Sequence, residues 1–150
     1  MHSTIGLSIM SAGITVLLLA THRARHIGWL LLTVQGGQLL NIGVKDLFQR
    51  ARPHFDDPLV TLGSYSFPSG HAAGSTVFWS FVVMLAGWWP ASVVTRRLLT
   101  GMGVAMVLLT SLSRVYLGAH YLSDVIAGMA EGLAWACACK LLHDARTMRA

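Results

Sequence analysis

The sequence contains few charged residues, and this scarcity excludes an ordinary water-soluble domain. Charged residues make up 11% of the 150 residues and hydrophobic residues 54%, whereas soluble domains carry about a quarter charged residues. This length and composition predict a single domain, residues 1–150, that is an integral membrane protein. The net charge of +5 therefore does not indicate a nucleic-acid partner, and we expect basic loops that face anionic lipid.

Cysteine and proline are also scarce. The two cysteines, Cys137 and Cys139, are two positions apart in an apolar segment and so point to different helix faces. That spacing predicts neither a disulfide nor a metal pair. Three of the four prolines fall between residues 45 and 70, where they exclude a continuous helix. A polar connection of this length inside a compact chain is usually functional.

Five apolar segments predict an all-α, polytopic membrane helix bundle of about five transmembrane helices. They cover residues 4–20, 27–44, 71–89, 98–116 and 121–142. The first segment is short for a span, and a signal peptide is the alternative. That alternative is weakened because no Lys or Arg precedes the segment, while Arg23 and Arg25 follow it. We expect Arg96 and Arg97 to close a short loop, and a polar, basic tail to follow the fifth helix.

The cationic residues are divided unequally between the two ends of the predicted bundle. When the spans alternate, seven of the eleven fall at one end: Arg23, Arg25, Arg96, Arg97, Lys140, Arg146 and Arg149. Positive-inside reasoning places this end and the C-terminus in the cytoplasm, and the opposite end in the periplasm or exterior, of a membrane that we expect to be a bacterial inner membrane. The other four, Lys45, Arg50, Arg52 and Arg114, oppose that bias, and a bound anion would explain them.

The stretch 113–124 carries a cation, an imidazole and a carboxylate between two apolar segments. His120 and Asp124 are four positions apart and share a face if a helix begins near His120. Asp124 could then accept a hydrogen bond from one ring nitrogen and leave the other free to attack. Arg114 could hold an anion against the ring. The alternative interpretation is a snorkelling arginine and a helix-capping aspartate.

Two further clusters have the same chemical character. Lys45 and Arg52 supply a point charge and a planar fork that suit phosphate oxygens, although a juxtamembrane basic patch is the alternative. Ser69 and Gly70 open the third predicted helix, where a hydroxyl and backbone N–H groups can meet an anion. His71 could protonate a leaving oxygen there, or this could be a capped helix start with an incidental histidine. No Cys/His metal spacing or carboxylate cage is present, so the pattern favours metal-independent chemistry.

These three clusters resemble the signature of the type 2 phosphatidic acid phosphatase and vanadium-dependent haloperoxidase superfamily, which is K-x6-RP, PSGH and SR-x5-H-x3-D. All eleven fixed positions match, in order, within residues 27–142. The matching segments are Lys45 to Pro53, Pro68 to His71 and Ser113 to Asp124. The resemblance implies a metal-independent membrane phosphatase, without a cofactor, that hydrolyses a lipid phosphate or diphosphate. Undecaprenyl diphosphate, phosphatidic acid and phosphatidylglycerophosphate are the candidate substrates.

The resemblance also implies roles for individual residues. His120 is expected to be the nucleophile that forms a phosphohistidine, with Asp124 as its orienting partner. His71 is expected to act first as general acid and then as the base that activates water. The phosphate clamp would consist of Lys45, Arg52, Ser69, Gly70 and Arg114. Membrane members of the family typically have six helices, so we expect this chain to be the family core without the first helix.

Two other functions remain as alternatives. One is an inactive or accessory truncated homologue. The other is a vanadate-dependent haloperoxidase, which the membrane composition disfavours because the known haloperoxidases are largely soluble.

Within the fifth predicted helix, Gly128 and Gly132 form a small-xxx-small step suited to close helix contact. Glu131 lies between them and is either a functional group or a member of a buried hydrogen bond.

Overall fold

The structure is a computed structural model that describes residues 2–54, 60 and 62–149, with side chains described from residue 5 onward. Every regular element in this part of the chain is helical, as predicted. The elements are α1 (His2–Ala20), η1 (Ala24–His26), α2 (Ile27–Leu30), η2 (Leu31–Gln35), α3 (Gly36–Phe48), α4 (Gly70–Trp88), α5 (Val93–Tyr116) and α6 (Leu122–Thr147).

The elements η1 to α3 join into one helical rod, Ala24–Phe48, which is longer than the predicted 27–44. Its middle turn, η2, is a π-helix. A π-turn changes the pairing of backbone carbonyls locally and needs compensating donors. The indole N–H of Trp135 on α6 supplies one, donating to the Leu32 carbonyl at 3.2 Å and the Thr33 carbonyl at 3.1 Å.

Two predicted boundaries were wrong. Arg96 and Arg97 do not close a loop but lie in α5, because Ser92 caps this helix by accepting a hydrogen bond from the Thr95 amide at 3.0 Å. The tail is helical as far as Thr147, where α6 ends. The ion pair between Lys140 and Asp144, at 2.5 Å and four positions apart, supports this last part of the helix.

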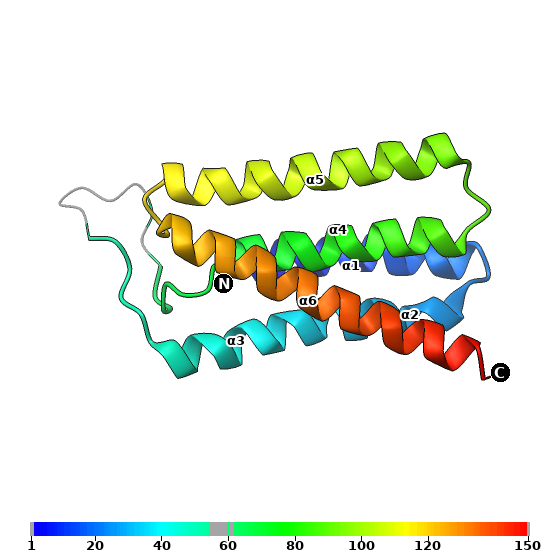
Figure 1. Ribbon diagram of the computed structural model, residues 1–150, viewed down its shortest axis with the longest axis horizontal. Helices are drawn as coiled ribbons and strands as arrows, with labels where there is room; N and C mark the ends of the chain where they lie inside the picture. Colours follow the sequence, from blue (N-terminus) through cyan, green and yellow to red (C-terminus); the bar gives the residue numbers. More distant parts are fainter. Residues whose placement is uncertain (1, 55–59, 61, 150) are drawn as a thin grey trace.

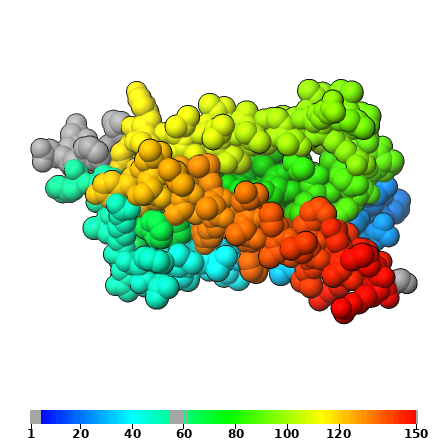
Figure 2. Space-filling model, in the orientation of Figure 1, coloured from blue at the N-terminus to red at the C-terminus, as the bar shows by residue number. Residues whose placement is uncertain are grey.

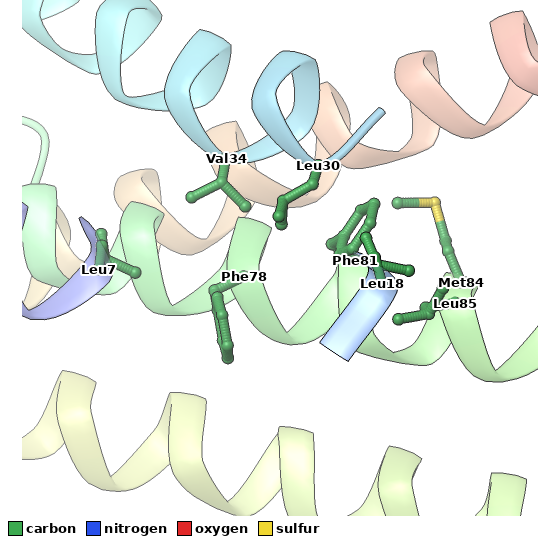
Figure 3. Packing of buried hydrophobic residues seen from close by; sticks show 8 residues of the cluster. All are labelled: Leu7, Leu18, Leu30, Val34, Phe78, Phe81, Met84 and Leu85. Carbon is green, nitrogen blue, oxygen red and sulfur yellow. The ribbon is translucent and has the colours of Figure 1, made fainter. Parts of the chain in front are cut away.

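Helix α4 lies at the centre of the bundle, with α1, the rod Ala24–Phe48, α5 and α6 around it (Figure 1). Within the span windows, 56% of α4 is buried but only 11% of α5. The core cluster joins α1, the rod and α4 (Figure 3). Its buried members are Leu7, Leu18, Leu30, Val34, Phe78, Phe81, Met84 and Leu85.

Four helical segments are long and apolar enough to cross a membrane: Ala24–Phe48, Gly70–Trp88, Val93–Tyr116 and Leu122–Thr147. The apolar part of α1, Ile5–Ala20, is shorter than these four. The described parts of the connection, residues 49–54 and 62–69, and the turn between α5 and α6 lie at one end of the bundle, and the α4–α5 turn and the end of α6 lie at the other (Figure 1). This is the arrangement that alternating spans predict.

Helices α4 and α6 cross closely because α6 carries glycines at the contact. A Cβ atom on Gly128 would come within 2.5 Å of the Ser69 carbonyl oxygen, and one on Gly132 within 2.8 Å of the Ala73 carbonyl oxygen. The Ser69 amide donates to the Asp124 carbonyl at 2.8 Å at the same crossing. The predicted small-xxx-small step is therefore a helix contact, and it brings the second motif against the third.

Candidate active site

Arg52 connects the first motif to the third. Its Nη1 donates to the Ala119 carbonyl at 2.7 Å and lies 3.2 Å from Nε2 of His120. Its Nε donates to the Ser64 carbonyl at 2.7 Å, and Nη2 donates to the Tyr65 carbonyl at 3.2 Å. Burial lowers the pKa of the guanidinium below its ordinary value, and the Asp124 charge opposes that change. The guanidinium is thus fixed in place against the imidazole ring.

His120 lies in the turn between α5 and α6 and is only 3% exposed. Its amide donates to the Arg114 carbonyl at 3.3 Å, and Gly118, at φ 65°, allows the turn that precedes it. Burial, reinforced by the charges of Arg52 and Lys45, lowers the pKa of the imidazole to about 4, although Asp124 acts in the opposite direction. At neutral pH the ring therefore carries no charge, and one of its nitrogens carries a lone pair instead of a proton.

Asp124 is fully buried in the first turn of α6. Its Oδ2 lies 3.7 Å from Nδ1 of His120, which is longer than a hydrogen bond. Ser66 stands between the two groups: its hydroxyl donates to Oδ2 at 2.5 Å and lies 3.5 Å from Nδ1. The Tyr121 amide also donates to Oδ2, at 3.0 Å. The carboxylate therefore reaches the ring largely through the serine hydroxyl.

Arg50 completes the surroundings of this carboxylate. Its Nη1 donates to Asp124 Oδ1 at 2.7 Å and to the Ser123 hydroxyl at 2.8 Å, and its guanidinium lies 4.3 Å from the centre of the Tyr121 ring. Neither Arg50 nor Ser66 was among the predicted site residues. The sequence signal for Arg50 was its place inside the K-x6-RP segment as one of the four cations that oppose the charge bias. Ser66 gave no comparable signal.

Lys45 lies in the last turn of α3 and holds the segment that leads into α4. Its ammonium donates to the Tyr65 carbonyl at 3.0 Å and to the Pro68 carbonyl. Gly70 begins α4 beside it: a Cβ atom there would lie 3.0 Å from Asn41 Oδ1 and 3.7 Å from Lys45 Cε. The absence of a side chain therefore lets the start of α4 approach the lysine.

Ser69 is the N-cap residue of α4 and is fully buried, but its hydroxyl does not cap the helix. Among the described residues the hydroxyl has no hydrogen-bond partner. A buried hydroxyl without a partner is costly. It is therefore free to donate to an oxygen of a bound anion at the start of α4.

His71 and Arg114 lie at the same end of the bundle as His120. His71 is partly exposed in the first turn of α4, and the charges of Arg114, Arg52 and Lys45 all act on its ring. Arg114 lies in the last turn of α5 and donates through Nε to the Ser113 hydroxyl at 3.1 Å. In the described part of the chain, neither side chain is hydrogen-bonded to Arg52 or His120. The contacts of the described residues connect Arg52 to His120 directly and His120 to Asp124 through Ser66.

Glu131 has a partner that sequence reasoning could not name. Asn41 on α3 donates through Nδ2 to Glu131 Oε2 at 2.8 Å, while Oε1 is buried without a partner among the described atoms. This pair joins the rod to α6 below the site. Across residues 2–54, 60 and 62–149, no group of three or more His, Cys, Asp or Glu side chains is arranged to hold a metal ion.

A family model described as the PAP2 superfamily matches residues 5–148. The match covers nearly the whole chain, and the fold and the three motifs agree with it, so this protein belongs to the PAP2 superfamily. The predicted resemblance is thereby confirmed.

Three similar proteins carry more specific names. Over 108 residues the chain is 35% identical to phosphatidylglycerophosphatase B of Bacillus subtilis (strain 168), covering 71% of this chain and 53% of that protein. Over 126 residues it is 33% identical to lipid A 1-phosphatase of Rhizobium johnstonii (strain DSM 114642 / LMG 32736 / 3841), covering 75% of this chain and 47% of that protein. The chain thus spans about half the length of the curated relatives it matches.

A solved structure supports the same fold. It is the crystal structure of a transmembrane PAP2-type phosphatidylglycerolphosphate phosphatase from Bacillus subtilis, which is 29% identical in sequence with a TM-score of 0.77. The match covers 92% of this chain and 67% of that one. Together with the four candidate spans, this likeness identifies the chain as an integral membrane protein.

Proposed function

We propose that this protein is a metal-independent membrane phosphatase that hydrolyses a lipid phosphate or diphosphate through a phosphohistidine intermediate. The observation that carries the proposal is the 3.2 Å approach of the Arg52 guanidinium to Nε2 of a buried, uncharged histidine, His120. The names of two relatives, both lipid phosphatases, support the substrate class. A phosphatidylglycerophosphate-type monoester is the first substrate to test.

The covalent step begins at His120. With a proton on Nδ1, directed at the Ser66 hydroxyl, Nε2 carries the lone pair. Nε2 attacks phosphorus, the bond from phosphorus to the lipid oxygen breaks, and His71 gives a proton to the departing alkoxide. His71 then takes a proton from water, whose oxygen attacks phosphorus, and the bond to Nε2 breaks. Inorganic phosphate leaves and both rings return to their first state.

The clamp for the phosphoryl oxygens would consist of the remaining predicted residues. Arg52 and Arg114 offer fixed N–H forks, and Lys45 offers a point charge. The buried Ser69 hydroxyl and the Gly70 amide add neutral donors at the start of α4. Phosphoryl transfer depends mainly on positioning and on stabilising charge at the equatorial oxygens. Three cations can supply much of the stabilisation that a metal ion supplies elsewhere.

An apolar groove supports a lipid rather than a soluble substrate. It has a volume of about 470 Å³ and lies between α5 and α6, with α4 as its floor (Figure 2). Its lining includes Thr76 on α4 and Met129 on α6. Thr76 is five positions beyond His71, and Met129 is five positions beyond Asp124. Five positions correspond to about 7.5 Å along a helix. A lipid tail in this groove would leave the phosphate near His120.

The orientation in the membrane is also part of the proposal. Seven of the eleven cations lie at the end opposite His120, so positive-inside reasoning places the C-terminus in the cytoplasm and the site at the periplasm or exterior. The bacterial sources of both curated relatives support a bacterial inner membrane.

The test is phosphate release from phosphatidylglycerophosphate by the purified protein in detergent with a chelator present. We expect release to continue with the chelator and to fall by at least about 1000-fold in His120→Ala, because the nucleophile is lost. The control is His22→Ala, an exposed histidine at the other end of the bundle, which should keep the wild-type rate. Equal rates of phosphate release in His120→Ala and wild type would show that His120 is not the nucleophile. Loss of phosphate release in the presence of the chelator would show that the reaction needs a metal ion.

A further inference from the structure

A second pocket lies at the opposite end of the bundle from His120, and the proposed phosphatase chemistry does not use it. Its volume is about 380 Å³, and it lies between the start of the rod Ala24–Phe48 and the last turns of α6. Its lining includes Arg25, Trp29, Leu32, His143 and Arg146. Two cations and two aromatic rings thus surround one hollow at the end of two membrane spans.

The pocket has unneutralised positive charge. Arg25 and Arg146 are exposed, and neither lies within 4 Å of a carboxylate in the described part of the chain. Arg25 donates through Nε to His26 Nε2 at 3.3 Å, and Arg146 lies over the Trp29 ring at 5.6 Å. The carboxylate nearest in sequence, Asp144, is paired with Lys140 at 2.5 Å. The chemistry of this lining therefore favours an anion.

The wall of the pocket is held in place by buried aromatic contacts. His143 is 8% exposed and stacks on Trp88 with the ring centres 4.0 Å apart. Its ring also meets the edge of Trp29 at 5.1 Å, and Nδ1 lies 3.4 Å from Asp144 Oδ1. Because the His143 ring cannot turn freely, the pocket has a defined shape, unlike a patch of surface arginines.

The other side of the pocket is apolar and continues along the membrane. Trp29 and Leu32 lie on the segment Ala24–Phe48, which is long and apolar enough to cross the bilayer. An occupant with a charged head and a hydrocarbon tail would contact both kinds of wall. We propose that this pocket binds the phosphate-bearing head group of an anionic phospholipid in the leaflet opposite the catalytic cluster.

Native mass spectrometry of the purified chain in detergent tests this with added phosphatidylglycerol or phosphatidylcholine. We expect phosphatidylglycerol to bind at least about tenfold more tightly. In the double variant Arg25→Gln, Arg146→Gln its affinity should fall by about tenfold. The matched control, Arg96→Gln, Arg97→Gln, removes the same charge at the same end but outside the pocket, and should stay within about twofold of wild type. Equal losses in the two double variants, or no loss in either, would overturn the proposal.

A second measurement does not depend on the arginine variants, so misfolding of those variants cannot affect it. Brominated phosphatidylglycerol should quench tryptophan fluorescence in the unaltered protein, and Trp29→Phe should lose a larger part of that quenching than Trp89→Phe, whose side chain does not line the pocket. Glycerol 3-phosphate, which has the same anion but no tail, should compete only at much higher concentration. Competition at the lipid's own concentration would mean a site for soluble phosphate and would overturn the lipid assignment.

Discussion

At the scale of single residues, the link between the buried carboxylate and the imidazole is a serine. Ser66 donates to Asp124 Oδ2 at 2.5 Å, whereas the carboxylate and ring nitrogen are 3.7 Å apart. A hydrogen bond to a buried charge contributes about 1.5–3 kcal/mol. We therefore propose that Ser66 is a positioning residue for His120 and acts through the carboxylate to which it is hydrogen-bonded.

The variant Ser66→Ala should lower kcat by about 10–100-fold while KM stays within about threefold, because it disturbs the orientation of the ring and leaves the cations in place. Steady-state kinetics with a lipid monoester measures both constants. Ser8→Ala, an exposed serine on α1, is the control and should match wild type. A rise in KM alone would assign Ser66 to substrate binding.

The low pKa of His120 makes a prediction about pH. Its ring is uncharged in the folded protein above about pH 4, well below the ordinary value of 6.5, mainly because of burial. The rate at which the phosphoenzyme forms from an aryl phosphate should stay constant from pH 7 to pH 5, because an aryl leaving group does not need a general acid. It should fall only as pH approaches 4. A rapid-quench titration that shows a fall centred near 6.5 would contradict this environment for the ring.

The same shift has a consequence for stability. Because the unfolded chain takes up the proton near pH 6.5 and the folded chain only near 4, His120 binds more protons in the unfolded state between these values. The folded protein therefore loses stability as pH falls from about 6.5 towards 4, and the loss of activity there must be measured before unfolding begins.

At the scale of helices, the crossing of α4 and α6 aligns the motifs. A Cβ atom on Gly128 would come within 2.5 Å of the Ser69 carbonyl oxygen, whereas one on Gly101 of α5 would have no atom within 4 Å. The first glycine is required by close packing and the second is not. This contact also fixes the distance between Ser69 and Asp124.

Gly128→Ala should therefore destabilise the protein by about 1–3 kcal/mol and reduce activity, because the helices must separate. Gly101→Ala is the matched control and should be neutral or slightly stabilising, since alanine favours helix by about 1 kcal/mol over glycine. Thermal unfolding in detergent, followed by circular dichroism, compares the two. Equal melting temperatures would mean that the crossing is not a determinant of stability.

The approximate positions of the helices could be predicted from hydropathy, but some helix ends and side-chain contacts could not. The Lys140–Asp144 pair accompanies the extension of α6 to Thr147, and the indole N–H of Trp135, about 100 positions away in the sequence, contacts the π-helical turn η2. The sequence motifs named His120 and Arg52, which the fold brings together. Ser66 and Arg50 were missed because their contacts with Asp124 span 58 and 74 positions and exist only after folding.

At the scale of the whole molecule, the bundle has two chemically different ends. Lys45 in the last turn of α3, Arg52 just after α3 and His120 in the α5–α6 turn lie at one end, and most of the other cations lie at the opposite end (Figure 1). In the proposed function, the lipid phosphate would meet water at the end that carries His120, while its hydrocarbon tail stays within the membrane. The groove along α4 would connect the two environments.

The central claim is that His120 receives the phosphoryl group at the place where these distant segments meet. The most direct measurement is rapid quench at alkaline pH with a lipid monoester labelled at phosphorus, followed by peptide mass spectrometry. Alkaline conditions preserve a phosphohistidine. We expect the label on His120, forming and decaying at rates that account for turnover, and absent from His120→Ala. Turnover with the label on another residue, or with no labelled peptide at any time, would contradict the account.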